Sequence, residues 1–176
     1  SNNGPSSTIQ ANGSAITNNG AIAVSGFLFN TAGARTLSGT GAWNVFDMQI
    51  NNGAVVNLGG SVNIAATNFT VNSIGGGTLD LGGNQLTLNN VNFLKKPNGV
   101  VTGAGTIRTQ GTTTLTVQPA GAFDAALDIS GGTTNVGTGT FSGSITIDPG
   151  ATMQVAIGAT VTHTGNLVNG GTLTNA

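Results

Sequence analysis

The chain has 176 residues, of which 38% are hydrophobic and 5% are charged, and it contains no cysteine and no tyrosine. Its hydrophobic content is too high for ordinary disorder, and its length allows one domain with a substantial core. Glutamate is absent, lysine and arginine are scarce, and Gly, Asn and Thr recur, so the composition argues against α-helix.

The charged groups exclude several classes of function. The four cations are too few for the many phosphate contacts of a nucleic-acid-binding surface; they are Arg35, Lys95, Lys96 and Arg108. The absence of cysteine excludes disulfides and thiolate metal sites. No segment approaches the roughly 20 apolar residues of a membrane span. We therefore expect no nucleic-acid binding, no cofactor and no membrane insertion by this segment.

The chain is expected to form a single domain overall, in which residues 1–30 are an N-terminal tail and capping strands and residues 31–176 are the β-solenoid repeats. Ser1–Gln10 is polar and is a candidate for donating a strand to another molecule. Ala21–Phe29 is more apolar and is predicted to cover one end of the repeats, which would otherwise expose strand edges. The chain starts without Met and stops within what resembles another repeat, so we expect a processed or excised piece of a longer protein.

A glycine followed by a small or branched residue and a strand pattern recurs about every 22 residues, at Gly33, Gly53, Gly77, Gly99, Gly121, Gly150 and Gly171. The longest step, from Gly121 to Gly150, predicts an insertion near Gly131–Gly132. Leucine-rich repeats have a similar period, but their leucine pattern is absent. We therefore predict an all-β fold, a right-handed parallel β-helix (β-solenoid) with coils of about 22 residues; an antiparallel β-sandwich is the alternative.

Alternation of apolar and polar residues predicts which side chains point into the solenoid. The predicted inward positions are Ala54, Val56, Leu58, Leu79, Leu81, Leu86, Leu88, Val91, Phe93, Leu115, Val117, Leu127, Ile129, Ile145 and Ile147. Phe93–Asn98 is predicted to be a loop in which Lys95 and Lys96 are exposed edge charges. In the stretch from Asp148 to Gly165, Pro149-Gly150 predicts a turn. Alternation then points four side chains inward: Ala151, Met153, Val155 and Ile157.

Three low-charge stretches resemble the Gly/Asn/Thr repeats of bacterial surface β-solenoids, such as autotransporter passengers and filamentous-haemagglutinin-type adhesin stalks. They are residues 51–59, 148–158 and 165–173. The resemblance spans most of residues 30–176 and is one of composition and period. It implies a secreted or cell-surface right-handed β-helix, and it carries over no active-site residues.

Few residues suggest chemistry. Asp124 and Asp128 would be too far apart along a strand for the paired carboxylates of glycoside hydrolysis. The stretch from Gly75 to Asp80 matches half of a calcium-binding repeat, without a second copy. His163 has no cysteine partner for a zinc site, and Trp43 is more readily explained by core packing than by sugar stacking. We expect no enzyme activity, no catalytic residue and no metal site.

The recurring outward feature is polar. Residues of outward parity follow one another at intervals of about 20 to 24 positions and are predicted to stack into a ladder: Thr70, Asn72, Asn90, Asn92, Thr114, Thr116, Thr138, Thr140, Thr160 and Thr162. Such a ladder stabilises stacked coils through side-chain hydrogen bonds. A regular ladder of this kind is also the feature that an ice-binding solenoid would need.

From these observations we expect a non-enzymatic structural module of an extracellular bacterial surface protein, either an adhesin stalk or a self-assembling filament subunit. The expected partners are a second copy stacked end to end or the rest of a longer chain, with a glycan or host-surface molecule as a further candidate ligand. The alternatives are an ice-binding solenoid and a polysaccharide-binding or polysaccharide-processing β-helix.

Overall fold

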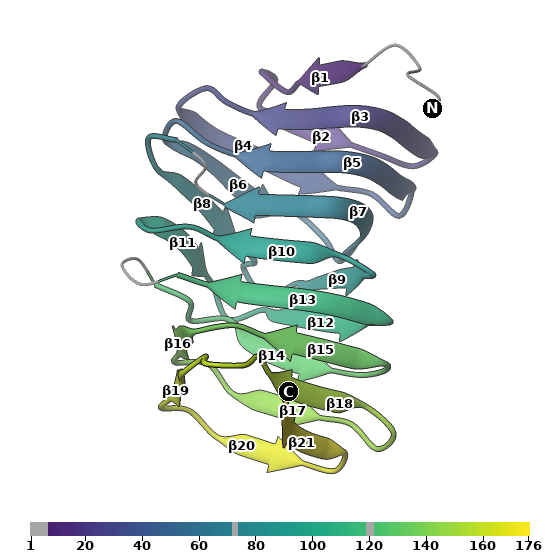
Figure 1. Cartoon of the computed structure of the whole chain (residues 1–176). Helices are drawn as coiled ribbons and strands as arrows, with labels where there is room; N and C mark the ends of the chain where they lie inside the picture. The colour runs from purple at the N-terminus through teal and green to yellow at the C-terminus, as the bar shows by residue number, and fades with distance from the viewer. Residues whose placement is uncertain (1–6, 72–73, 119–121) are drawn as a thin grey trace.

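The computed structural model describes residues 7–71, 74–118 and 122–176, and all regular structure in these ranges is β-strand (Figure 1). The first seven strands are β1 Thr8–Gln10, β2 Ala15–Thr17, β3 Ala21–Phe29, β4 Gly33–Ser38, β5 Ala42–Ile50, β6 Ala54–Leu58 and β7 Val62–Val71. The next seven are β8 Gly77–Asp80, β9 Gln85–Asn89, β10 Asn92–Lys95, β11 Gly99–Thr102, β12 Thr106–Gln110, β13 Thr112–Val117 and β14 Ala126–Ile129. The last seven are β15 Thr133–Val136, β16 Gly139–Phe141, β17 Ile145–Ile147, β18 Thr152–Val155, β19 Val161–His163, β20 Leu167–Asn169 and β21 Thr172–Asn175.

Every pairing between described strands is parallel, so the prediction of a β-solenoid is confirmed and the antiparallel sandwich is wrong. The coils stack into a rod with three faces (Figure 1). Face one contains β1, β10, β13, β15, β18, β21 and the second halves of β3, β5 and β7. Face two contains the first halves of those three strands, followed by β9, β12, β14, β17 and β20. Face three contains β2, β4, β6, β8 and β11, then β16 and β19.

The repeat length follows from the residues that pair along face one. Gly26 and Thr174 belong to the same row of paired positions, so 148 residues make seven turns of about 21 residues each. The predicted length was about 22. β2 to β21 form about eight turns, and β1 adds a ninth strand to face one above them. The first described residues are therefore stacked in the same parallel arrangement as the rest.

The core fills the space between the three faces. All fifteen side chains predicted to point inward in the strands from Ala54 to Ile147 are buried, which confirms the alternation pattern. Aromatic side chains stack from coil to coil inside it: the ring centroids of Phe69 and Phe93 are 5.4 Å apart, and those of Phe123 and Phe141 are 5.0 Å apart. Edge-to-face contacts of this kind add to the hydrophobic stabilisation of the stack.

Turns of defined chemistry join the strands at the corners. Asp148–Ala151 is a turn in which the Ala151 N–H donates to the Asp148 carbonyl at 3.0 Å and Gly150 has φ 82°, as Pro149-Gly150 predicts. A similar turn follows β18, where the Ala159 N–H donates to the Ala156 carbonyl. Ile157 is in the middle of that turn and is 86% exposed, so its prediction as an inward residue is wrong.

Two further expectations are corrected. Phe93 to Lys95 belongs to β10, and the turn begins only at Lys96, where the Gly99 N–H donates to the Lys96 carbonyl. No insertion lies near Gly131–Gly132, because the paired residues Thr114, Asn135 and Gln154 advance by 21 and then 19 positions. Gly121, from which the long step is counted, lies outside the described residues. Gly150 is at the corner between faces two and one, whereas Gly99 begins a strand on face three, so the glycine series contains glycines of different corners.

The described ranges contain no helix that is long and apolar enough to cross a membrane.

Candidate functional site

A row of outward positions runs along the whole of face one, and we call it the axial row. Its members pair one below the other: Thr8, Gly26, Asp47, Asn68, Asn92, Thr114, Asn135, Gln154 and Thr174. The Asn92 side-chain amide donates to the Asn68 side-chain oxygen at 3.1 Å, which links two coils directly. Polar side chains in register can extend hydrogen bonding along the rod beyond the backbone ladders.

A second row on face one contains threonine in four successive coils. Thr112, Thr133, Thr152 and Thr172 pair in order, and we call this set the threonine row. In the same four coils, the axial row beside it contains Thr114, Asn135, Gln154 and Thr174. The C-terminal half of face one therefore presents hydroxyl and amide groups without an ionisable side chain in these two rows.

The structure divides the predicted ladder between two faces. Asn92 and Thr114 are neighbours in the axial row, whereas Thr70 and Thr116 share a different row in which Leu94 separates them. Asn90 is at the corner before β10 with φ 57°, and its side-chain oxygen accepts from the Thr112 N–H at 2.9 Å. Asn72 lies outside the described residues.

The remaining four ladder residues are on face three. Thr140 pairs with Thr162, and the Thr160 N–H donates to the Thr138 hydroxyl at 3.1 Å. They form a short ladder of their own, because β16 and β19 follow a corner that the sequence pattern does not reveal. The structure thus brings together Asn92 with Thr114, and Thr138 and Thr140 with Thr160 and Thr162, in separate places.

The charged side chains of face two form a small network. Arg108 lies 3.6 Å from the Asp128 carboxylate and 3.7 Å from the Asp148 carboxylate, which belong to the next two coils. Burial raises the pKa of Asp128, and the neighbouring Asp148 raises it further, while Arg108 acts in the opposite direction. Asp128 is therefore engaged with Arg108, and Asp124 accepts a hydrogen bond from the Ser142 hydroxyl.

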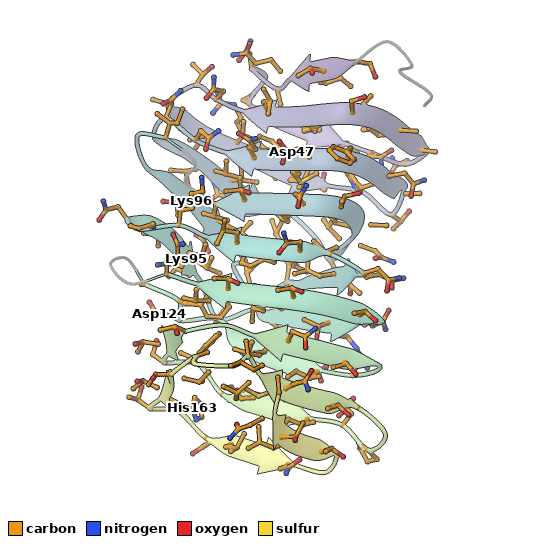
Figure 2. The ribbon with its side chains drawn as sticks, viewed as in Figure 1. Asp47, Lys95, Lys96, Asp124 and His163 are labelled. Atoms are coloured by element: carbon orange, nitrogen blue, oxygen red, sulfur yellow. The ribbon has the colours of Figure 1, made fainter. Side chains whose placement is uncertain are left out.

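The other candidate residues of the sequence have structural contacts. Trp43 is buried in the core with its ring edge-to-face against Phe27, as expected. Asp80 accepts from the Gly82 N–H at 2.9 Å, and His163 contacts the Gly143 carbonyl through Nε2 at 2.9 Å, toward the C-terminal end of the rod (Figure 2). Among the residues that the structure describes, no three His, Asp or Glu side chains converge as they would around a metal ion.

Two cations point into the rod. Lys95, predicted to be an exposed edge charge, is 0% exposed because it occupies an inward position between Val71 and Val117. Its ammonium donates to the Gln118 carbonyl at 2.9 Å, and burial lowers the pKa of this lysine. Arg35 is also buried, and its Nη1 donates to the carbonyls of Thr31 and Gly33.

The C-terminal coil differs from the coils before it at inward positions. His163, Asn169 and Asn175 are paired with Phe141, Ile147 and Val155 of the preceding coil. A cavity of about 190 Å³ opens beside them, lined by apolar side chains and His163. Leu167 and Leu173 remain apolar and are 49% and 46% exposed. This coil therefore directs fewer apolar side chains into the core than the coil before it.

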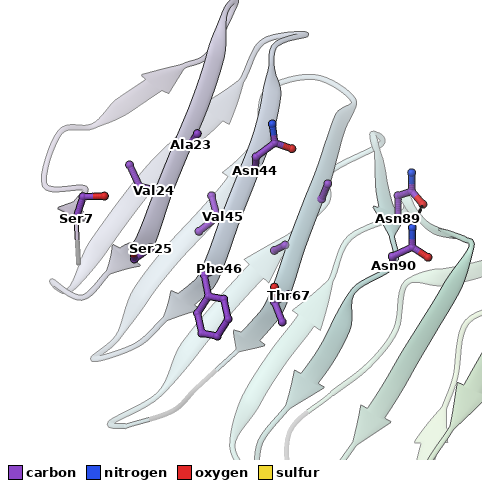
Figure 3. Close-up of a pocket in the computed structure, with 12 residues that line it drawn as sticks. Ser7, Ala23, Val24, Ser25, Asn44, Val45, Phe46, Thr67, Asn89 and Asn90 are labelled. Carbon is purple, nitrogen blue, oxygen red and sulfur yellow. Dashed lines mark hydrogen bonds between the residues drawn. The ribbon is translucent and has the colours of Figure 1, made fainter. Parts of the chain in front are cut away.

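Sequence reasoning missed Phe46, which lies in the middle of β5 and is 61% exposed. Phe46 and Asp47 both point outward, so the alternation shifts by one position where β5 bends from face two to face one. The signal in the sequence was a break in the pattern: Trp43 and Val45 are inward, and the next inward residue is Met48. Phe46 lies within a shallow hollow at this corner (Figure 3).

We found no match of this chain to a family model, to a curated protein or to a solved structure.

Proposed function

We propose that this chain is a non-enzymatic structural module, a stiff stalk or spacer of an extracellular bacterial surface protein. The observation that carries the proposal is the unbroken parallel pairing of nine strands along face one, from Thr8 to Thr174. Eight strand-to-strand spacings of about 4.8 Å give a length of about 38 Å. Each coil rests on the next through backbone hydrogen bonds and a shared core, which supports a rod that resists bending.

The surface of the rod also suits a spacer. With 5% charged residues, it has little charge for salt to screen, so its shape should be insensitive to ionic strength. Its carboxylates are explained by a turn, by Gln49, by Ser142 and by Arg108, and we propose no catalytic role for them. The Gly/Asn/Thr composition, which resembles that of bacterial surface solenoids, is the support for an extracellular location.

The two ends favour a stalk over a filament subunit. At the C-terminal end, three inward positions are polar, which weakens the apolar contact that a second copy would need. At the N-terminal end, residues 8–10 already pair with β3 of the same chain as β1, so this part of the proposed donor segment is occupied. Apolar contact with a second copy at the C-terminal coil would therefore rest on the half-exposed Leu167 and Leu173.

Ice binding is not the function that we propose. A surface that orders ice would need a regular two-dimensional array, and the threonine row supplies one line of it. The adjacent axial row places Asn135 and Gln154 between Thr114 and Thr174, and the threonines of β16 and β19 are on another face. The array is therefore interrupted after a single row.

A distance measurement along the rod tests the proposed function. The chain has no cysteine, so Ala15→Cys and Thr162→Cys place two spin labels at exposed positions on face three. Seven coil-to-coil steps separate β2 from β19, because the coil between β11 and β16 contributes Phe123 to face three in place of a strand. They correspond to about 34 Å. Double electron–electron resonance should give one narrow distance distribution near this value, unchanged between low and high salt.

Broad or salt-dependent distances would contradict a stiff spacer. Sedimentation and negative-stain electron microscopy of the unlabelled chain separate the two structural roles. Isolated short rods are the expected result, and long uniform fibres would instead establish a filament subunit. The location is tested by labelling intact source cells with an antibody to face one, which should bind without permeabilisation.

A further inference from the structure

Phe46 differs from the other aromatic residues of this chain in its solvent exposure. The other six phenylalanines and the single tryptophan are each 2% exposed or less, whereas Phe46 is 61% exposed. Leaving an aromatic ring in water forgoes the stabilisation that burial would provide. Its neighbours in sequence, Val45 and Asp47, fit the core and the axial row, so the fold does not need a phenylalanine at this position.

The residues around Phe46 keep the space beside it open. On either side of β5, small side chains occupy the adjacent strands: Ala23 and Ala65 flank Asn44, and Ser25 and Thr67 line the hollow near Phe46. Asn44 and Phe46 therefore stand out from the bend of β5, with a hollow of about 610 Å³ around them (Figure 3). A second hollow of about 290 Å³ shares Asn44, Ala65 and Asn89 with the first.

The two hollows together make an extended, uncharged depression across several coils. Its polar groups are side-chain amides and hydroxyls, and neither lining includes an ionisable side chain. Asn90 is held by its contacts with Asn89 and the Thr112 N–H. The Asn44 amide and the Thr67 hydroxyl make no hydrogen bond to other residues that the structure describes, so they are available to a ligand.

We propose that this depression binds a neutral polysaccharide. The face of an aromatic ring packs against the C–H face of a sugar ring, and asparagine amides both donate to and accept from hydroxyl groups. The joined hollows suit several sugar units of a chain. This binding site is additional to the stalk function and does not depend on it.

Charge decides between ligand classes. The nearest carboxylate is that of Asp47, which follows Phe46 directly and accepts a hydrogen bond from Gln49. It would repel an acidic polysaccharide, and no cation lines the depression to compensate. A protein partner would require a larger apolar surface than one phenylalanine among asparagines offers, since stable interfaces bury on the order of 1,000 Å² or more.

Calorimetric titration of the purified chain with a defined panel tests the proposal. The neutral probes are hexasaccharides of β-1,4-linked glucose, xylose, mannose and N-acetylglucosamine, and the acidic probe is hexagalacturonate. At least one neutral hexasaccharide should bind, and hexagalacturonate should bind at least tenfold more weakly. Phe46→Ala should weaken the neutral binding about tenfold, the loss expected for one aromatic contact.

Matched variants separate the site from general effects on folding. Phe46→Tyr keeps a ring and should retain binding, and Asn44→Ala should weaken it several-fold. Ile157→Ala removes an even more exposed apolar side chain from a distant turn and should bind as the wild type does. The proposal is overturned if no neutral hexasaccharide binds or if Phe46→Ala binds as well as the wild type. It is also overturned if the wild type self-associates in sedimentation and Phe46→Ala abolishes that association, which would identify the depression as a contact between copies.

Discussion

Lys95 shows how the stack can override the ordinary preference of a residue. The sequence Lys95-Lys96-Pro97 suggests an exposed loop, because lysine is rarely buried without a partner. In the structure the turn starts at Lys96, and Lys95 takes the inward position that Val71 and Val117 occupy in the neighbouring coils. Its ammonium reaches the Gln118 carbonyl, so the cost of burial is partly offset by a hydrogen bond.

The buried ammonium of Lys95 predicts how the stability of the fold depends on pH. Burial lowers the pKa of Lys95 in the folded state below the ordinary value of a lysine, so folding favours its neutral form. The associated stability is present above the unfolded pKa and is lost as pH falls through the lower folded pKa. We therefore expect the free energy of unfolding of the wild type to increase relative to that of Lys95→Met as pH rises from 7 to 10.

Urea denaturation at several pH values measures this shift. Lys96→Met is the matched control, because it removes one positive charge from the adjacent, half-buried residue. Lys95→Ala should be less stable than Lys95→Met by about 2 kcal/mol, since it also leaves a cavity. A difference between wild type and Lys95→Met that does not change with pH would contradict the prediction.

At the residue scale, the sequence predicted the buried residues of the core far better than the residues whose burial departs from the expected pattern. Alternation placed residues such as Leu86 and Ile145 correctly, because a strand repeats every two residues whatever its neighbours are. Lys95 keeps the inward parity of Phe93, and it was misplaced because lysine is rarely buried. Alternation failed at Ile157, where the strand ends in a turn, and at Phe46, where the bend of β5 shifts the parity by one position. Those shifts depend on where each coil must turn a corner to remain stacked on the coil before it, and a single coil does not show this in its sequence.

At the scale of elements, the corners set the shape of each coil. Gly111 and Gly132 occupy the corner between faces two and one in successive coils, with φ of 62° and 67°. A Cβ atom added to Gly132 would lie 2.2 Å from the Gly111 carbonyl oxygen, which is backbone and cannot easily move. Both the conformation and the close approach of stacked coils therefore require glycine at this position.

This corner gives a prediction with a control in the adjacent residue. Gly132→Ala combines an unfavourable φ with a steric overlap and should destabilise the fold by about 2–4 kcal/mol. Gly131→Ala meets no atom within 4 Å and should stay within about 0.5 kcal/mol of the wild type or be slightly more stable. Thermal unfolding followed by circular dichroism measures both, and equal effects of the two substitutions would show that the corner is not under this constraint.

Glycine spacing predicted the period of the coils but not which corner each glycine occupies. Gly99 begins a strand of face three, and Gly150 is in the turn that leads into β18 on face one. Both glycines precede a strand and have similar neighbours in the sequence, so the sequence pattern does not distinguish the corners that they occupy. Pairing between coils was needed to separate them, and the same pairing replaced the predicted ladder with the axial row and the threonine row.

At the scale of the whole molecule, the ends determine whether rods remain separate. A solenoid exposes unpaired strand edges and core side chains at each end, so an end that faces water needs polar residues there. The C-terminal coil has them at three inward positions, paired with Phe141, Ile147 and Val155. Asn169 has a further local role, because its side chain accepts a hydrogen bond from the Gly171 N–H at 3.1 Å.

If polar inward residues of the C-terminal coil are replaced by the apolar residues that pair with them in the preceding coil, copies of the chain should associate through this coil. In the double variant Asn169→Ile and Asn175→Val, these positions match Ile147 and Val155, and Leu167 and Leu173 then join a larger apolar surface. We expect sedimentation velocity to show association that increases with concentration, while the wild type remains a single species. The control is Val168→Ile with Thr174→Val, which adds apolar volume at outward positions of the same strands.

The comparison with the control identifies the cause of any association. If outward and inward substitutions promote it equally, surface hydrophobicity alone is responsible and the polar residues do not protect the end. If neither associates, the cavity beside His163 and the unpaired strand edges are sufficiently shielded without Asn169 and Asn175. Association of the inward variant alone would show that the side chains of Asn169 and Asn175 keep this coil from stacking against a second copy of the chain.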